Sequence, residues 1–252
     1  MRLCINVLAS LLLAAPCALA FGAPSDVTWW RQRGGADPLT PLTLGALAWW
    51  EPSRGYSTNA GGTLTNLTAV GTNYNMISVN DALGPVLQVA RVNGLDTLGF
   101  HGNTAMFNTL YGYSTPRTQE VFFVAAVTNT PTTRCLFSSW DVSGINALFN
   151  TMPGAKLQMR GGSVTSTVSD QVTNRYAVFD MVYRGSHSTI FTNGVLGLDV
   201  NQILTNMSGI ALAAFFVSTN GVYSFASMFT FTNELTAAQR SNANWYCTNR
   251  FL

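Results

Sequence analysis

Charged side chains are scarce in this sequence. Asp, Glu, Lys and Arg together make up 10% of the 252 residues, whereas soluble domains average about 25%. Lys156 is the only lysine, and the formal net charge is +2. Proteins that bind nucleic acid through its phosphates need clustered Lys and Arg, and no such cluster is present. The composition therefore argues against nucleic acid as a partner.

Long apolar runs are missing once the first 20 residues are set aside. Those residues have the features of a secretory signal peptide. Arg2 gives a positive start, residues 5–15 are apolar, and Ala18-Leu19-Ala20 is a small-x-small cleavage pattern. The apolar stretch is shorter than the roughly 20 residues of a membrane-spanning helix. We predict a signal peptide over residues 1–20 and no transmembrane segment in the mature chain.

Lipidation at Cys17 is the alternative to ordinary cleavage. Pro16 stands where a lipidation site usually carries a small residue, which favours the ordinary signal peptidase. With either processing route the mature chain is exported. We expect to find it in the extracellular space, at the cell surface or in the periplasm.

Cysteine is also rare. Removal of the signal peptide leaves only Cys135 and Cys247. Two cysteines in an exported chain are compatible with one disulfide, which would tie a central strand to the C-terminal helix. Two buried free thiols are the alternative, because free cysteine packs like a small hydrophobic residue.

The motifs of several common chemistries are absent. Neither His101 nor His187 has a metal-ligating partner four residues away, which excludes an HExxH zinc site. The sequence has no Gly-x-Ser-x-Gly motif and no phosphate-binding glycine loop. The two mature thiols fit no Cys/His catalytic signature. We therefore expect a protein that is not an enzyme.

Short β-prone runs separated by turn residues fill the chain from Leu42 onward. They recur about every 8–12 residues, which is typical of a sandwich or barrel. Residues 121–127 are apolar without interruption, as expected for a central strand covered on both faces. The sequence predicts an all-β antiparallel sandwich, a jelly roll, over residues 42–252. Residues 21–41 precede it as an N-terminal arm or linker.

Two local signals are stronger than the rest. In the stretch from Arg175 to Asp199, β-prone runs flank a turn at residues 184–188 and a second turn at Asn193-Gly194. Asn-Gly accommodates the positive φ angles of a type I′ hairpin turn, so we expect this stretch to form the middle of an antiparallel sheet. Near the C-terminus, Asn233 or Thr236 can cap a short helix that follows without Gly or Pro.

The order of several motifs resembles the concanavalin A-like lectin/glucanase superfamily, in particular its laminin-G-like jelly rolls. Ala46-Leu-Ala-Trp-Trp-Glu-Pro-Ser is similar to the opening strand of that family. The segment 94–102 resembles one that usually ends in Phe-Asp-Gly, with His101 in place of the Asp. Thr189-Ile-Phe-Thr-Asn-Gly and the run 225–231 before the helix resemble its hairpin and closing strand.

The resemblance implies a lectin-like sandwich whose loops or concave face carry a site. Glycan-cleaving members use two carboxylates, and the Glu-x-Asp-x-x-Glu motif of the laminarinase-like branch is absent here. We expect an exported, non-catalytic module that recognises a glycan or an extracellular protein. A structural component of a cell-surface layer or appendage, and a diverged glycan-cleaving enzyme, are the alternatives.

Four residues are the candidates for binding or metal ligation. The rings of Trp140 and Tyr183 suit stacking against a sugar. Asp141 follows a predicted strand and is the best-placed ligand for calcium, which needs 6–8 oxygen ligands, or else it is a turn-forming aspartate. Asp180 interrupts an apolar strand on the same face as Val178, where it either lines a concave surface or forms bonds within the sheet.

Overall fold

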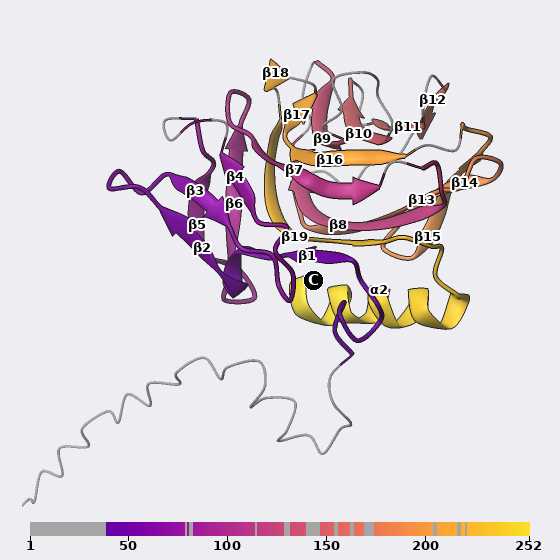
Figure 1. Cartoon of the computed structure of the whole chain (residues 1–252), viewed down its shortest axis with the longest axis horizontal. Coiled ribbons are helices and arrows are strands. Elements are labelled where there is room, and N and C mark those ends of the chain that lie inside the picture. The colour runs from indigo at the N-terminus through magenta and orange to yellow at the C-terminus, as the bar shows by residue number, and fades with distance from the viewer. Residues whose placement is uncertain are drawn as a thin grey trace, which may run out of the picture. The chain divides into compact units, whose positions relative to one another are not determined.

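The computed structural model describes residues 39–252 apart from 79, 81–82, 114, 129–131, 140–146, 154–155, 162–163, 169–173, 204–205, 216–217 and 220. Residues Leu39–Leu252 form one compact unit. The described part is mostly β-strand, arranged in two large antiparallel sheets with one C-terminal α-helix (Figure 1). The prediction of an all-β antiparallel sandwich is confirmed. The predicted signal peptide, Cys17 and nearly all of the predicted arm lie outside the described residues.

The first sheet has eight strands in the order β15-β14-β13-β8-β19-β6-β5, and β1 also pairs with β19. The strands are β1 (Ala48–Trp50), β5 (Val86–Val92), β6 (Leu95–His101), β8 (Gln119–Val127), β13 (Ala177–Tyr183), β14 (Ser188–Thr192), β15 (Val195–Val200) and β19 (Val222–Phe231).

The second sheet has nine strands in the order β12-β11-β10-β9-β16-β7-β4-β3-β2. They are β2 (Tyr56–Thr58), β3 (Leu64–Leu67), β4 (Met76–Ser78), β7 (Met106–Tyr113), β9 (Arg134–Ser138), β10 (Ala147–Met152), β11 (Lys156–Gly161), β12 (Val164–Val168) and β16 (Met207–Leu212). A small hairpin of β17 (Ala214–Phe215) and β18 (Ser218–Thr219) and a 3-10 helix η1 (Pro52–Arg54) complete the described elements.

Strand β8 shows why the chain forms layers. Successive side chains of a strand point to opposite faces. Phe123 belongs to the apolar core between the two sheets, whereas Phe122 belongs to a second core under the helix. The uninterrupted apolar run therefore supplies side chains to both cores, and both faces of this central strand are covered, as the sequence predicts.

Helix α2 (Ala237–Phe251) lies against the outer face of the eight-stranded sheet, along the lower side of Figure 1. Thr236 is its N-cap, and its side chain and that of Gln239 form a capping box. A Ser or Thr cap of this kind satisfies backbone N–H groups that the first turn leaves unpaired. Of the two caps that the sequence allows, Thr236 is the one used.

The Asn193-Gly194 hairpin forms as predicted, but its place in the sheet differs. Asn193 and Gly194 have φ angles of 50° and 79° and join β14 to β15, consistent with the positive φ angles of a type I′ turn. Strand β15 is an edge of its sheet, so this stretch is not its middle. Turn chemistry specifies which neighbouring strands pair and carries no information on what lies beyond them.

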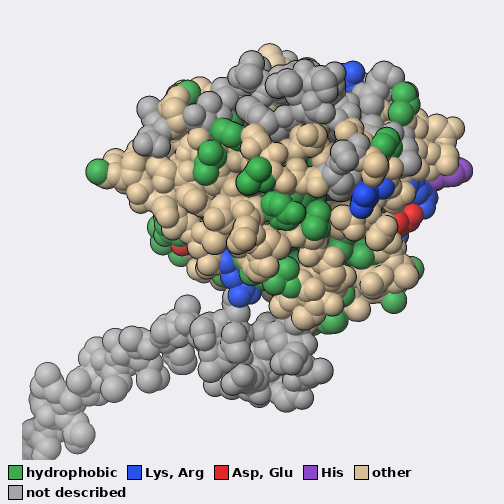
Figure 2. Space-filling model, viewed as in Figure 1, with side chains coloured by type: hydrophobic (Ala, Val, Ile, Leu, Met, Phe, Trp, Pro, Cys, Tyr) green, Lys and Arg blue, Asp and Glu red, His purple; other side chains and the backbone are tan. Residues whose placement is uncertain are grey.

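The scarcity of charge is visible on the surface. On the face drawn in Figure 2, charged side chains are few, and neutral polar groups surround small groups of hydrophobic side chains. The large hydrophobic residues that are exposed among the described residues include Leu110, Val195 and Val89. Solubility therefore depends largely on uncharged polar groups.

Cys135 and Cys247 are both buried free thiols, so the predicted disulfide does not form. Cys135 lies on β9 in the nine-stranded sheet, whereas Cys247 lies on α2, in the core outside the eight-stranded sheet. The eight-stranded sheet separates them, and packed sheets are about 10 Å apart. A disulfide needs Cα atoms within about 7 Å.

We expect the chain without residues 1–20 to take up two alkyl groups in denaturant without reductant. In the native protein both thiols should react slowly, because burial raises the pKa of each well above its usual value and the thiolate is the reactive form. Intact-mass measurement after alkylation checks both statements. Alkylation that appears only after reduction would contradict the free thiols.

Candidate functional site

Three acidic residues are fully buried on the side of the eight-stranded sheet that faces α2: Glu51, Glu120 and Asp180. Period-two alternation explains their common side. Asp180 shares its face with Val178, and Glu120 shares its face with Phe122. Buried carboxylates need a counter-charge or hydrogen bonds, and helix α2 supplies both.

Arg240 is the counter-charge near the start of the helix. It donates from Nε to Oε1 of Glu120 at 2.9 Å and from Nη2 to Oε2 at 3.1 Å. Leu235 donates its backbone N–H to the same carboxylate at 2.7 Å. Asp180 Oδ2 lies 3.2 Å from Arg240 Nε, but neither Asp180 oxygen receives a hydrogen bond, because the single Nε hydrogen is directed at Glu120.

The environment of Asp180 favours the neutral acid. Burial raises the pKa of Asp180 well above its usual value, and the charge of Glu120 raises it further, while Arg240 opposes both. Burial acts to lower the pKa of Arg240, but the hydrogen bonds and charge of Glu120 outweigh this effect and raise it. Arg240 is therefore a permanent cation between two carboxyl groups.

Glu51 is held in the same way near the end of the helix. Arg250 donates to Oε1 of Glu51 through Nη2 and, at 3.0 Å, through Nε. The hydroxyl of Tyr246 donates to Oε2 at 3.3 Å. Burial, followed by the Glu51 charge, raises the pKa of Tyr246. The two clusters fix both ends of α2 to the sheet, and no carboxylate in them is exposed.

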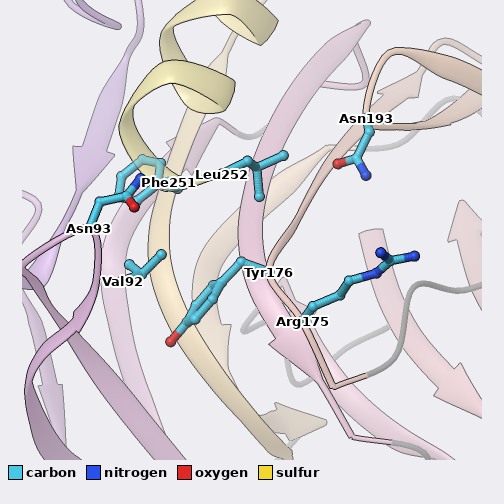
Figure 3. Close-up of a pocket in the computed structure, with 7 residues that line it drawn as sticks. All are labelled: Val92, Asn93, Arg175, Tyr176, Asn193, Phe251 and Leu252. Atoms are coloured by element: carbon cyan, nitrogen blue, oxygen red, sulfur yellow. The ribbon is translucent and has the colours of Figure 1, made fainter.

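A surface pocket lies beside the C-terminal end of α2 (Figure 3). It has a volume of about 470 Å³, within the usual range of small-ligand sites. Four segments converge on it: the end of β5 with its turn, the residues before β13, the β14–β15 turn and the helix end. Its lining residues are Val92, Asn93, Arg175, Tyr176, Asn193, Phe251 and Leu252.

The polar groups of the pocket differ in how far they are already bonded. Tyr176 donates its hydroxyl to Thr97 Oγ1 at 3.2 Å, which fixes the ring. The Nδ2 of Asn93 donates to the carbonyl of Arg250 at 3.1 Å. The side-chain oxygen of Asn193 accepts from the Val178 N–H at 2.8 Å. Arg175 is exposed, and its guanidinium has no bonding partner among the described residues.

Tyr183 and Asp180, the two sequence-predicted site residues that the structure describes, do not line this pocket. Tyr183 is 2% exposed in the core between the sheets, so its ring is not on the surface. Trp140 and Asp141 lie outside the described residues. Among the described residues, no group of three or more His, Cys, Asp or Glu side chains can hold a metal ion, and the calcium prediction at Asp141 stays untested.

Sequence reasoning missed the pocket residues, although three of them lie in the stretch it singled out. Arg175 begins that stretch, Tyr176 begins its first β-prone run, and Asn193 is the first residue of the predicted hairpin turn. The turn signal explained Asn193 by its backbone alone. Only the topology shows that this turn lies beside residues near positions 92 and 251.

No protein-family model matches the sequence, and no curated protein matches it. Solved structures do match in fold. The ligand-binding domain of botulinum neurotoxin serotype D, in complex with N-acetylneuraminic acid, superposes with a TM-score of 0.58 at 10% identity, over 82% of this chain and 53% of that one.

The sialidase of Trypanosoma rangeli in complex with the inhibitor DANA gives a TM-score of 0.58 at 12% identity, over 85% of this chain and 34% of that one. The binding domain of botulinum neurotoxin serotype G gives 0.53 at 12% identity, over 80% and 51%. This chain thus spans about a third to a half of these proteins. At such identity the likeness is one of fold alone.

No helix among the described residues has both the length and the apolar character needed to cross a membrane.

Proposed function

We propose that this chain is an exported, non-catalytic glycan-binding module and that the pocket beside α2 is its binding site. The observation that carries the proposal is the pocket itself, which combines a fixed aromatic ring with polar groups that retain unused hydrogen-bonding capacity. The resemblance of the sequence motifs to laminin-G-like jelly rolls and the signal-peptide pattern support export and a lectin-like role.

The pocket chemistry suits a sugar. A pyranose ring has apolar C–H faces and a rim of hydroxyl groups. The Tyr176 ring and Leu252 provide apolar surface, with Val92 and Phe251 buried beneath it, and Asn93 and Asn193 place amides beside it. Ligand sites typically combine an apolar lining with a few placed polar groups. One of the fold neighbours carries N-acetylneuraminic acid in its ligand-binding domain, which supports a glycan as ligand.

The positions of the buried acids disfavour catalysis. Most glycoside hydrolases use two carboxyl groups about 5–9.5 Å apart with the glycosidic bond between them, and sialidases, which use a tyrosine nucleophile, are an exception. Glu120 and Asp180 do approach each other, but both are fully buried under α2 and share Arg240. A sugar would have to displace the helix to reach them. This arrangement supports a binding role over a diverged hydrolase.

Tyr176→Ala should weaken glycan binding about tenfold, because loss of an aromatic contact and its buried area costs on the order of 1.4 kcal/mol or more. A glycan array, screened with calcium and with chelator, first identifies a binding sugar. Titration of that sugar by NMR then compares the variant with Tyr56→Ala. Tyr56 is an exposed tyrosine on β2, outside the pocket, so its loss should leave affinity unchanged.

Thermal unfolding confirms that both variants remain folded. An array on which the protein binds no glycan, with or without calcium, would overturn the proposed function. Equal affinities for Tyr176→Ala and the wild-type protein would leave binding intact but exclude this pocket as its location.

A further inference from the structure

The polar groups of the pocket are divided between two sides. Figure 3 shows Arg175 and Asn193 on one side, with Asn93 and Phe251 on the other and the side chain of Leu252 directed between them. Of the seven lining residues, only Arg175 has a charged side chain, so one side carries a cation and the other does not, which restricts the kind of sugar that fits.

Donors outnumber acceptors on the side with Arg175 and Asn193. The Asn193 oxygen is bonded to the Val178 N–H at 2.8 Å, and the Asn193 N–H donates to the Val178 carbonyl at 2.8 Å. The bond to the side-chain oxygen fixes the orientation of the amide, so its NH₂ group is free for a ligand and its oxygen keeps one lone pair. A guanidinium has five N–H donors and no acceptor. Arg175 therefore cannot accept a hydrogen bond from a sugar hydroxyl on this side.

The opposite side keeps acceptors. Asn93 uses one hydrogen of its Nδ2 to donate to the Arg250 carbonyl at 3.1 Å, and no hydrogen bond to its Oδ1 is formed by the described residues, so this oxygen can accept. The Tyr176 oxygen donates its hydrogen to Thr97 at 3.2 Å and keeps lone pairs. Hydroxyl groups donate to acceptors of this kind.

The electrostatics agree with the donor arrangement. Arg175 is exposed and forms no hydrogen bond or ion pair with the described residues, and none of the seven lining residues is Asp or Glu. An ionised carboxylate is acceptor-only and pairs with a guanidinium through two parallel N–H···O bonds. It therefore complements the Arg175 guanidinium, whereas a neutral sugar hydroxyl would leave the positive charge unpaired.

We propose that the pocket binds a sugar acid, with the carboxylate against Arg175 and the Asn193 NH₂ group and the ring hydroxyls directed to Asn93 and Tyr176. The inference rests on the proposed glycan-binding function and narrows it to carboxylated sugars. Uronic acids and sialic acids share this chemistry, and the experiment separates the two.

Matched ligand pairs give a direct test. Glucuronate is compared with glucose, galacturonate with galactose, and N-acetylneuraminate with its methyl ester, all by NMR titration of the full mature chain. At least one acid should bind about tenfold or more tighter than its neutral partner, because charge-assisted hydrogen bonds are roughly twice as strong as neutral ones. The preference should shrink as salt is added, since salt screens exposed charges.

The variants locate the effect. Arg175→Ala should abolish the preference for the acid, and Arg175→Lys should keep only part of it because a lysine lacks the planar fork. Arg117→Ala is the matched control. Arg117 is an exposed arginine two residues before the start of β8, outside the pocket, and it donates a hydrogen bond to Thr115. It should leave the preference unchanged.

The outcomes separate this inference from the proposed function. Equal binding of acids and neutral partners would overturn the inference while glycan binding stands. An equal loss of the preference for the acid in Arg175→Ala and Arg117→Ala would also overturn it, because the preference would then come from the net charge of the protein. Failure of every sugar, neutral or acidic, would count against the proposed function itself.

Discussion

Arg240→Met should lower the free energy of unfolding by at least about 3 kcal/mol, because removing one partner of a buried ion pair leaves an uncompensated charge. Arg240 is the cation between Glu120 and Asp180, at 2.9 Å and 3.2 Å, and both acids are fully buried. Methionine retains much of the apolar side-chain volume but removes the charge and the hydrogen bonds. Chemical denaturation followed by tryptophan fluorescence measures the change.

Arg184→Met is the matched control. Arg184 pairs with Glu234 at 2.7 Å, but the two side chains are 32% and 30% exposed, and surface ion pairs contribute about 0–1 kcal/mol. Glu234 also accepts from Arg240 at 3.2 Å, so it keeps a cationic partner when Arg184 is replaced. The same substitution should therefore cost much less at this position. If both variants lost the same stability, the buried position of Arg240 would have no special role.

A double variant tests the coupling between Arg240 and Glu120. Glu120→Gln alone removes a buried charge and weakens the hydrogen bond from the Leu235 N–H. The double variant Glu120→Gln/Arg240→Met should lose less free energy of unfolding than the sum of the two single losses. Each single substitution leaves the other residue of the pair without its partner, whereas the double variant removes both charges.

Local pattern was sufficient to predict several elements. The run 121–127 is apolar throughout, and the structure places β8 between β13 and β19 with apolar residues on both faces. Asn193-Gly194 forms its hairpin and Thr236 caps the helix, since both depend on backbone chemistry within a few residues.

The acid pair could not be found by searching for neighbouring carboxylates. Glu120 and Asp180 lie in different strands, and they meet because β8 and β13 pair with Val182 opposite Glu120 and Asp180 opposite Phe122. That register is a tertiary property. The available signal was an acid inside an apolar strand together with an arginine in the predicted helix, and it favours an ion pair without naming the partner.

The sequence also did not show which side chains point into the core and which reach the surface. Tyr183 was predicted as a surface ring, but every residue of β13 is buried, because β13 is covered by the second sheet on one face and by α2 on the other. An aromatic residue in such a strand carries no mark that distinguishes core from surface. The pocket likewise depends on residues near positions 92, 175, 193 and 251, which only the complete topology brings together.

Asp180 should make the protein less stable as the pH rises above about 4. Burial first, and the Glu120 charge second, raise the pKa of Asp180 above its ordinary value of 3.8. The native state therefore keeps a proton that the unfolded chain releases. Below pH 4 both states hold it, and the contribution to stability is fully present. Above that pH the unfolded state is increasingly favoured, by about 1.4 kcal/mol per pH unit for one proton, until the native-state pKa is passed.

Asp180→Asn should remove this fall, because an amide stays neutral and of similar size at every pH. We expect unfolding free energies measured between pH 4 and 8 to decline in the wild-type protein more steeply than in the variant, so that the variant gains relative stability as the pH rises. Asp199→Asn, which removes a carboxylate 43% exposed and paired with His187, should retain the steep decline. Parallel curves for the wild-type protein and Asp180→Asn would show that Asp180 is already ionised in the native state, with Arg240 neutralising both acids at once.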